Sequence, residues 1–342
     1  MLADRTYSRG DAPPPQAIAD IVNRSRLRVA DFVPWVVALA SFFLFPRSLS
    51  LGTEVLVAVL FVLSIDLVVG YAGIVTLGHG AFFGLGAYCA GVLAVNGFGD
   101  PILGLMLAAV LAGVAGLVSG AIILRAQGLT LMMFTLGTLL MLEEAANRAG
   151  RLTGGSDGLS DMVVKPLLGI WDWDFFGRTG YCYCLVVLLF GFIVVRTIVM
   201  SPFGRSLRGI RENAARMEAI GAPVRRRLIV VYAISAALAG TAGAVNAEVH
   251  QFVALNVLSF EFSASGLIML ILAGPGRLYG AFIGPPIYII ASHQLAVLDP
   301  TYWVFWLGVV LIAVVMFGRG GILGIADNLI AWSRAGRKKR AP

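Results

Sequence analysis

Long apolar stretches alternate with short polar connections along most of the chain, and this alternation predicts the architecture. Ten apolar segments follow one another, at about 33–46, 53–70, 74–95, 102–124, 128–146, 181–199, 228–248, 262–275, 281–296 and 303–318. Several of them have the roughly 17 to 25 residues that a helix needs to cross a bilayer. The pattern predicts an all-α integral membrane protein with about ten transmembrane helices. The first segment and the last three are short, which leaves tilting, thinning of the bilayer or partial entry open for them.

Positive charge predicts the orientation of these helices. With the N-terminus in the cytoplasm, 21 of the 26 Lys and Arg residues fall on the cytoplasmic side and 5 fall outside, as the positive-inside rule requires. We therefore expect both termini to be cytoplasmic. The expected divisions are a polar and basic tail over 1–32, a transmembrane domain over 33–318 and a basic tail over 319–342.

Composition excludes several classes of protein. Hydrophobic residues make up 58% of the chain and charged residues 13%, which is not the composition of a disordered chain, a secreted disulfide scaffold or an ordinary soluble enzyme. The net charge of +7 is accounted for by the cytoplasmic segments, so no nucleic-acid partner is expected. The remaining polar surface is expected to face water on either side of membrane lipid.

Two polar loops are longer than a simple connection needs. The exterior loop over 147–180 contains the sequence TGGSDGLS from Thr153 to Ser160, followed by aromatic residues typical of a membrane interface. The cytoplasmic loop over 200–227 is rich in helix formers between 203 and 220 and has a stop signal at Gly221. This predicts one short amphipathic helix at the cytoplasmic surface. Spacing alone leaves two roles open for it, adhesion to the membrane surface and docking of a soluble partner.

Small residues recur at every fourth position in three places, which predicts close packing between neighbouring helices. The three stripes are Gly104, Ala108, Ala112, Gly116 and Gly120; Ala236, Gly240 and Ala244; and Gly276, Gly280 and Gly284.

The usual signatures of catalysis are missing or lie in the wrong context. The GGSDG sequence at 154–158 matches the spacing of a hydrolase nucleophile elbow, but it lies in an exterior loop rather than on a strand-to-helix turn. The histidines His79, His250 and His293 lie on separate segments without metal-ligand spacing. No Walker A sequence is present, so a partner chain would have to hydrolyse any ATP that drives the protein. We expect no catalytic, cofactor-binding or metal-binding residue in this chain.

One acidic residue is expected inside the membrane. Asp66 lies near the end of the second apolar segment and is followed by the glycines Gly70 and Gly73. Ionisable groups at this depth are costly and often functional, and glycine can interrupt a helix so that its backbone lines a cavity. A role in a cavity and a role in helix packing both remain open for Asp66.

Five blocks of sequence together resemble the permease subunit of branched-chain amino acid ABC importers, the LivM type. The blocks are GYAGIVTLGHGAFFGLGAY at 70–88, LTGGSDGL at 152–159, FGRSLRGIRENAARMEAIG at 203–221, ILAGPGRLYGAFIG at 271–284 and FGRGGILG at 317–324. Their order and spacing are similar to the family over about residues 53 to 326.

The resemblance implies a transport subunit without enzymatic activity, in the bacterial inner membrane. Its implied partners are a second, LivH-like permease, two ATP-binding subunits that hold ATP and magnesium, and a periplasmic substrate-binding protein. The implied substrates are branched-chain or other hydrophobic amino acids. In this family the cytoplasmic loop is the coupling loop that contacts the ATPase, which favours docking over membrane adhesion.

The resemblance also implies two sets of functional residues. The ATPase coupling loop would use Arg205, Arg208, Arg211, Glu212, Asn213, Glu218 and Gly221. The translocation path or its entrance would include Asp66, Gly70, Gly73, His79, Thr153, Gly154, Gly155, Ser156, Asp157 and Gly158.

The chain departs from the family pattern at two of these places, and other functions stay open. Ala214 follows Asn213 where relatives often have a second glutamate, and Leu140 replaces a glutamate of the fifth span. A permease for urea or another small amide or carboxylate is the alternative within the same class. An ion-coupled secondary transporter that uses Asp66 is the alternative from another class, and an intramembrane hydrolase built on Ser156 is a third.

Overall fold

The computed structural model describes residues 33–44, 48–160, 162–167, 169, 171, 173–174 and 177–317. Within these ranges the chain forms helices and no strand, apart from two isolated bridges that join Leu159 to Val253 and Leu167 to Trp171. The expected tails over 1–32 and 319–342 lie outside the described residues, as does the block at 318–324.

Each of the ten apolar segments contains a helix in the structure. The helices are α2 (Val33–Leu44), α3 (Leu49–Asp66), which continues as the π-helix η2 (Leu67–Ala72), α4 (His79–Val95), α5 (Pro101–Ile123), α6 (Gly128–Arg148), α8 (Arg178–Met200), α11 (Val224–His250), α12 (Phe260–Ala273), α13 (Gly284–Leu298) and α14 (Trp303–Phe317). The loops contain α7 (Gly150–Thr153), α9 (Pro202–Glu212), α10 (Ala214–Ala219) and the 3₁₀ turns η3 (Gly155–Asp157), η4 (Leu255–Leu258) and η5 (Gly280–Phe282).

Six of these helical stretches are long and apolar enough to cross a membrane. They are Leu49–Ala72, Pro101–Ile123, Gly128–Arg148, Arg178–Met200, Val224–His250 and Gly280–Leu298. Four shorter apolar helices accompany them, at Val33–Leu44, His79–Val95, Phe260–Ala273 and Trp303–Ile312. The expectation of a helical, multi-pass membrane protein is therefore confirmed. The count of ten spans and the cytoplasmic termini stay predictions.

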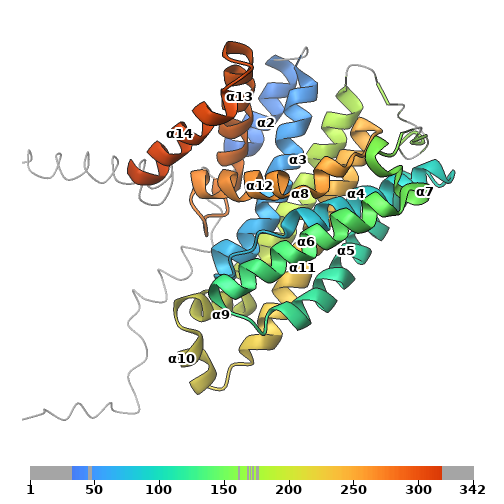
Figure 1. Ribbon diagram of the computed structural model, residues 1–342. Helices are drawn as coiled ribbons and strands as arrows, with labels where there is room; N and C mark the ends of the chain where they lie inside the picture. The colour runs from blue at the N-terminus through green and yellow to red at the C-terminus, as the bar shows by residue number, and fades with distance from the viewer. Residues whose placement is uncertain are drawn as a thin grey trace, which may run out of the picture.

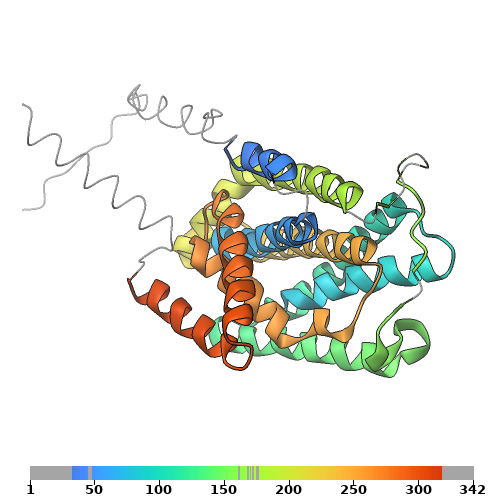
Figure 2. The same ribbon diagram turned by 90° about the horizontal axis from the view of Figure 1, so that it is seen from above.

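Helix α11 occupies the centre of the molecule, where it packs against α5, α4 and α3 (Figures 1 and 2). Helices α9 and α10 lie at one end of the helical body, and α7 lies toward the other. Helix α12 crosses the direction of α13 and α3, and α14 slants away from α13 at the edge. The cytoplasmic and exterior loops expected from the sequence are therefore far apart in space.

Small residues form the seam between α5 and α11, as their spacing predicts. Ala108, Ala112, Ala236 and Ala244 are fully buried. A Cβ atom on Gly240 would lie 2.9 Å from the Ala108 carbonyl oxygen and even closer to the Ala112 side chain. The two backbones therefore approach as closely as they do because this stripe lacks larger side chains, which is how helices associate without a hydrophobic driving force.

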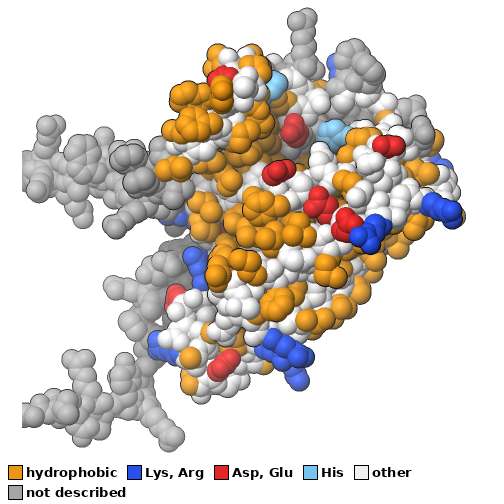
Figure 3. Space-filling view, in the orientation of Figure 1, with side chains coloured by type: hydrophobic (Ala, Val, Ile, Leu, Met, Phe, Trp, Pro, Cys, Tyr) orange, Lys and Arg blue, Asp and Glu red, His pale blue; other side chains and the backbone are white. Residues whose placement is uncertain are grey.

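Helix α2 is the most weakly attached of the apolar helices at the edge. It has no buried residue, and it lies along α8 (Figure 2). Its Trp35 ring packs edge-on against Phe192 at 5.4 Å between centroids, and its Ser41 hydroxyl shares a 2.7 Å hydrogen bond with the Tyr181 hydroxyl. Figure 3 shows hydrophobic side chains gathered over α13 and α14, as expected for a surface that faces lipid or another chain.

Candidate functional site

The loop over 200–227, predicted to be cytoplasmic, begins with the amphipathic helix α9, whose local sequence explains where it starts. Pro202 occupies the first helical position, and the Ser201 hydroxyl accepts a 3.3 Å hydrogen bond from the Gly204 N–H. Leu207 and Ile210 are buried against the membrane helices. The prediction of an amphipathic helix here is confirmed.

The loop contains two helices where the sequence predicted one. Asn213 has an extended backbone with φ −159°, which ends α9. Its side-chain oxygen then accepts a 2.9 Å hydrogen bond from the Arg216 N–H and so caps α10. Asparagine competes with a continuous helix in this way because its short side chain can bond the backbone of the next turn. Gly221 follows α10 with φ +84°, in agreement with the expected stop.

The predicted docking residues of this loop differ in their contacts. Arg205, Arg208, Arg211, Glu212 and Glu218 are all exposed. Arg208 and Arg211 also contact the membrane domain. The Arg211 Nη1 donates a hydrogen bond to the Gly70 carbonyl oxygen, and the Arg208 guanidinium lies 5.2 Å from the centre of the Tyr71 ring.

Both arginines contact the place where the second span is broken. Helix α3 changes to π-helical geometry at Leu67 and ends at Gly73, whose φ of +76° is unfavourable for other residues. A non-helical segment over 73–78 follows, and α4 begins at His79. π-Helical turns are rare and occur frequently at functional sites.

Asp66 joins this broken span to a distant loop. Its carboxylate Oδ1 accepts a 2.7 Å hydrogen bond from the Gly276 N–H, and the residue is 2% exposed. Gly70 has no space for a Cβ atom, because the Asp66 carboxylate and the Gly276 nitrogen lie against its backbone. We call Asp66, Gly70, Arg211 and Gly276 the Asp66 joint. The structure thus places Asp66 in a packed contact at the end of the body near α9.

His79 is 1% exposed and links three helices. Its Nε2 lies 2.6 Å from the Ser235 hydroxyl, which itself donates a 2.6 Å hydrogen bond to the Ser64 carbonyl oxygen. Ser235 must therefore accept from the Nε2–H, which leaves Nδ1 unprotonated. Among the described residues Nδ1 has no hydrogen-bond partner. His79 ties α4 to α11 and α3 in this arrangement.

Side-chain hydroxyls compensate for the missing helical hydrogen bonds of the segment over 73–78. Leu77 N–H donates to the Thr135 hydroxyl of α6 at 3.2 Å. The Ser263 hydroxyl of α12 accepts from the Gly80 N–H at 3.2 Å and donates to the Leu77 carbonyl oxygen at 2.6 Å. Non-helical backbone at membrane depth needs partners of this kind, since lipid offers none.

The residues of the loop predicted to be exterior form a compact turn of their own. Thr153 donates through its hydroxyl to the Ala146 carbonyl oxygen at 2.5 Å. Gly154, Gly155 and Gly158 all have positive φ, at 74°, 58° and 77°. These conformations suit glycine and let the turn lead into the bridge between 159 and 253.

Ser156 and Asp157 are exposed within the 3₁₀ turn η3. The Ser156 hydroxyl donates to the Asp157 carboxylate at 3.2 Å. A hydrolase nucleophile needs a sharp strand-to-helix turn, which this segment does not provide. The predicted path residues therefore fall into two groups, since η3 follows α7 at one end of the body and the Asp66 joint contacts α9 at the other.

Glu248 of α11 is a buried acidic residue, 4% exposed, that was not predicted from the sequence. Its Oε2 accepts a 2.6 Å hydrogen bond from the Tyr183 hydroxyl, while Oε1 lies beside Gly104 without a hydrogen-bond partner among the described residues. The criterion that singled out Asp66, an acidic side chain in an apolar span, would also have found Glu248.

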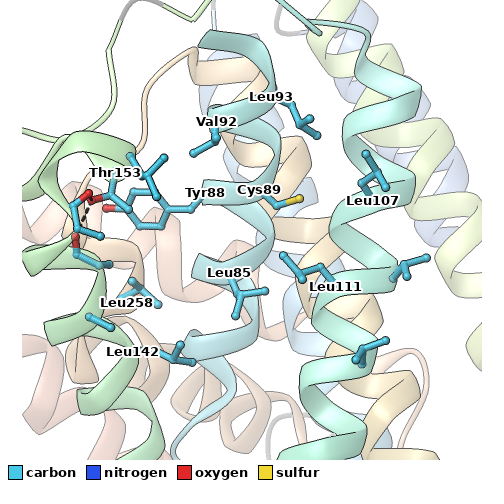
Figure 4. A pocket seen from close by; sticks show the side chains of 16 residues that line it. Leu85, Tyr88, Cys89, Val92, Leu93, Leu107, Leu111, Leu142, Thr153 and Leu258 are labelled. Carbon is cyan, nitrogen blue, oxygen red and sulfur yellow. Dashed lines mark hydrogen bonds between the residues drawn. The ribbon is translucent and has the colours of Figure 1, made fainter. Parts of the chain in front are cut away.

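The cavities between α4, α5 and α6 are apolar and lie outside the Asp66 joint. A groove of about 710 Å³ lies between α4, α5 and α6 (Figure 4) and continues into a second cavity of about 630 Å³ that shares Leu85, Leu142 and Ala145 with it. The Tyr88 hydroxyl at this groove has no hydrogen-bond partner among the described residues. Such a lining suits hydrocarbon rather than a polar or charged molecule.

Comparison with known proteins identifies the family. The family model described as "Branched-chain amino acid transport system / permease component" matches residues 49–315. The chain belongs to this permease family. The matched range runs from α3 into α14 and includes every candidate site residue, whereas α2 lies before it.

Individual members of the permease family share about a quarter of their residues with this chain. It is 28% identical over 315 residues to the high-affinity branched-chain amino acid transport system permease protein LivM of Escherichia coli (strain K12), covering 84% of this chain and 73% of that relative. It is 27% identical to the probable branched-chain amino acid transport permease protein LivM of Methanocaldococcus jannaschii, covering 68% and 76%. It is also 27% identical to the autoinducer 2 import system permease protein LsrC of Enterobacter sp. (strain 638), covering 70% of each. No solved structure matches.

The resemblance to LivM permeases is therefore confirmed. The protein is a multi-pass membrane permease component rather than one of the soluble enzymes that its composition already argued against.

Proposed function

We propose that this chain is a permease subunit of an ATP-driven importer in the bacterial inner membrane, where it moves branched-chain or other hydrophobic amino acids. A periplasmic binding protein delivers the substrate, a second LivH-like permease completes the pathway, and two ATP-binding subunits hold ATP and magnesium. This chain binds no cofactor itself. Both termini lie in the cytoplasm, on the same side as α9 and α10.

The observation that carries the proposal is the position of α9. It is a short amphipathic helix outside the apolar spans, and its buried face fixes it to them. Its exposed Arg205 and Glu212, with Glu218 of α10, form a charged surface free for a soluble partner. A rigid helix in this position can pass a movement of the ATP-binding subunit to the spans as a rigid body.

The substrate class rests on the permease family and on its members. Two of the similar proteins are described as branched-chain amino acid permeases, and a third as an autoinducer 2 import permease. The family therefore includes importers of different small molecules, and autoinducer 2 is the competing substrate to test beside urea and small carboxylates. The apolar character of the large cavities does not discriminate between these substrates.

The decisive experiment is purification of tagged protein in mild detergent at low salt, with mass spectrometry of the chains that accompany it. Low salt matters because exposed charge pairs are screened as ionic strength rises. We expect a second permease and ATP-binding subunits, and uptake of radiolabelled leucine by proteoliposomes that depends on ATP and the binding protein. Uptake of labelled autoinducer 2 without uptake of leucine would change the substrate. Uptake driven by an ion gradient without ATP would refute the proposal.

Charge reversal locates the docking surface in the same assay. Arg205→Glu together with Glu212→Lys is expected to abolish co-purification of the ATP-binding subunits. The matched control is Arg151→Glu, which reverses an exposed charge on α7 at the opposite end of the body. Equal loss in both variants would mean that the protein is unstable rather than that docking is impaired.

A further inference from the structure

We infer that Arg211 is a positioning residue that connects α9 to the membrane spans, and that the Asp66 joint carries a movement of α9 to both the broken second span and the loop between α12 and η5. This inference rests on the proposed function, because it specifies how the coupling helices act on the transport path.

The first half of the connection runs from α9 to η2. Gly70 lies in the last turn of η2, where backbone carbonyl oxygens have no partner within the helix. The Arg211 guanidinium supplies the missing donor and places a positive charge at this helix C-terminus, where it is stabilising. Its side chain also fills the space beside Gly73, since a Cβ atom there would lie 2.9 Å from Arg211 Cγ.

The second half runs from α3 to the loop after α12. The Asp66 carboxylate holds the Gly276 N–H, and the Arg211 guanidinium lies beside Gly276. A Cβ atom on Gly276 would lie 2.7 Å from Arg211 Nη1 and 3.0 Å from the Gly70 carbonyl oxygen. Gly276 itself has φ +81°. Three segments that are distant in sequence therefore meet around one guanidinium group.

The contact is directional, unlike the apolar part of the α9 interface. Leu207 and Ile210 bury apolar surface, and apolar contacts resist separation more than sliding. A hydrogen bond from a charged donor fixes distance and angle. Displacement of α9 therefore carries η2 with it, and a π-turn is a natural place for a helix to bend. Because Gly276 takes part in the same contact, α12 and α13 receive the displacement at the same time as α3.

Arg211→Ala and Gly276→Ala test the inference from opposite sides of the contact. The first removes the guanidinium from α9, and the second displaces it by adding a methyl group to the loop. Each variant is expected to keep the ATP-binding subunits bound and hydrolysing ATP, while uptake per ATP falls by about tenfold, the change expected when one hydrogen bond from a charged donor is lost. The double variant is expected to match the single variants within about twofold, because both changes break one interaction.

Two further variants keep the test decisive. Arg211→Lys retains one donor and the charge, folds even if the alanine variant does not, and is expected to recover part of the uptake per ATP. Gly97→Ala, at a glycine that also has a positive φ of +86° and has nothing within 4 Å of its Cβ position, is the matched control for Gly276→Ala and is expected to couple normally.

The outcomes separate this inference from the proposed function. Normal uptake per ATP in Arg211→Ala and Gly276→Ala, or losses that multiply in the double variant, would overturn the inference and leave the importer intact. Loss of the ATP-binding subunits in Arg211→Ala would also overturn it, because Arg211 would then act in docking as Arg205 does. Absence of ATP-binding subunits from the wild-type complex would refute the proposed function itself.

Discussion

The seam between α5 and α11 leads to a prediction that the structure makes quantitative. Gly240→Ala adds one methyl group where a Cβ atom would lie 2.9 Å from the Ala108 carbonyl oxygen and closer still to the Ala112 side chain. Neither neighbour is the end of a flexible side chain, so the two helices have to move apart. Gly137→Ala makes the same chemical change on α6, where nothing lies within 4 Å of the Cβ position.

The difference between these two variants gives the magnitude. Alanine in a helix is favoured over glycine by about 1 kcal/mol, and this term applies to both sites. Gly240→Ala additionally overpacks the seam, which typically costs about 1–3 kcal/mol. The free energy of unfolding of Gly240→Ala should therefore be lower than that of Gly137→Ala by about 1–3 kcal/mol, since the common term cancels.

The assay is reversible unfolding in mixed micelles, with SDS titrated into a mild detergent and helicity followed by circular dichroism. Both variants are compared with wild type in the same lipid and detergent, because bound lipid shifts apparent stability. Unfolding free energies that agree within about 0.5 kcal/mol, the usual scatter of neutral substitutions, would refute the close approach of α5 and α11.

Three other contacts give predictions of their own. Tyr183→Phe leaves the Glu248 carboxylate without its hydrogen-bond donor and should lower the free energy of unfolding by about 1–3 kcal/mol. Glu248→Gln keeps an acceptor oxygen for Tyr183 and should cost less. An SDS titration in which Glu248→Gln is the less stable variant would contradict this prediction. Ser235→Ala removes the link between His79 and α3 and should also lower the unfolding free energy by about 1–3 kcal/mol, so unchanged stability would argue against a buried bond there. Thr135→Val removes the acceptor of the non-helical segment, and amide hydrogen exchange should rise by about tenfold within that segment while α5 stays protected. Exchange that rises everywhere or nowhere would contradict the assigned partner.

Sequence reasoning located every apolar helix because each carries its own signal of length and hydrophobicity. The break after α3 also had a local signal in Gly70 and Gly73, although no sequence pattern distinguishes a π-turn from an α-helical one. The split of the cytoplasmic helix at Asn213 was missed because the surrounding residues favour a helix. Asparagine in such a place ends one helix by capping the next.

The candidate site was harder to predict, because its contacts join distant residues. Arg205, Arg208 and Arg211 follow one another at intervals of three residues, so they lie within one side of a helix and look alike in sequence. All three are exposed, and only the packing of α9 against η2 shows that Arg208 and Arg211 also contact the spans. Asp66 and Gly276 are 210 residues apart, and no local pattern could pair them.

The Asp66 joint also constrains the energetics of the proposed transport cycle, because a rigid contact transmits free energy equally in both directions. If closure of the ATP-binding subunits changes the preferred state of the spans by some factor, occupation of the spans by substrate changes the affinity for nucleotide by the same factor. A loaded binding protein on the exterior face would thus favour nucleotide binding on the cytoplasmic face without touching it. In the proposed cycle, the contact made by Arg211 would therefore restrain ATP consumption when no substrate is present, as well as deliver work.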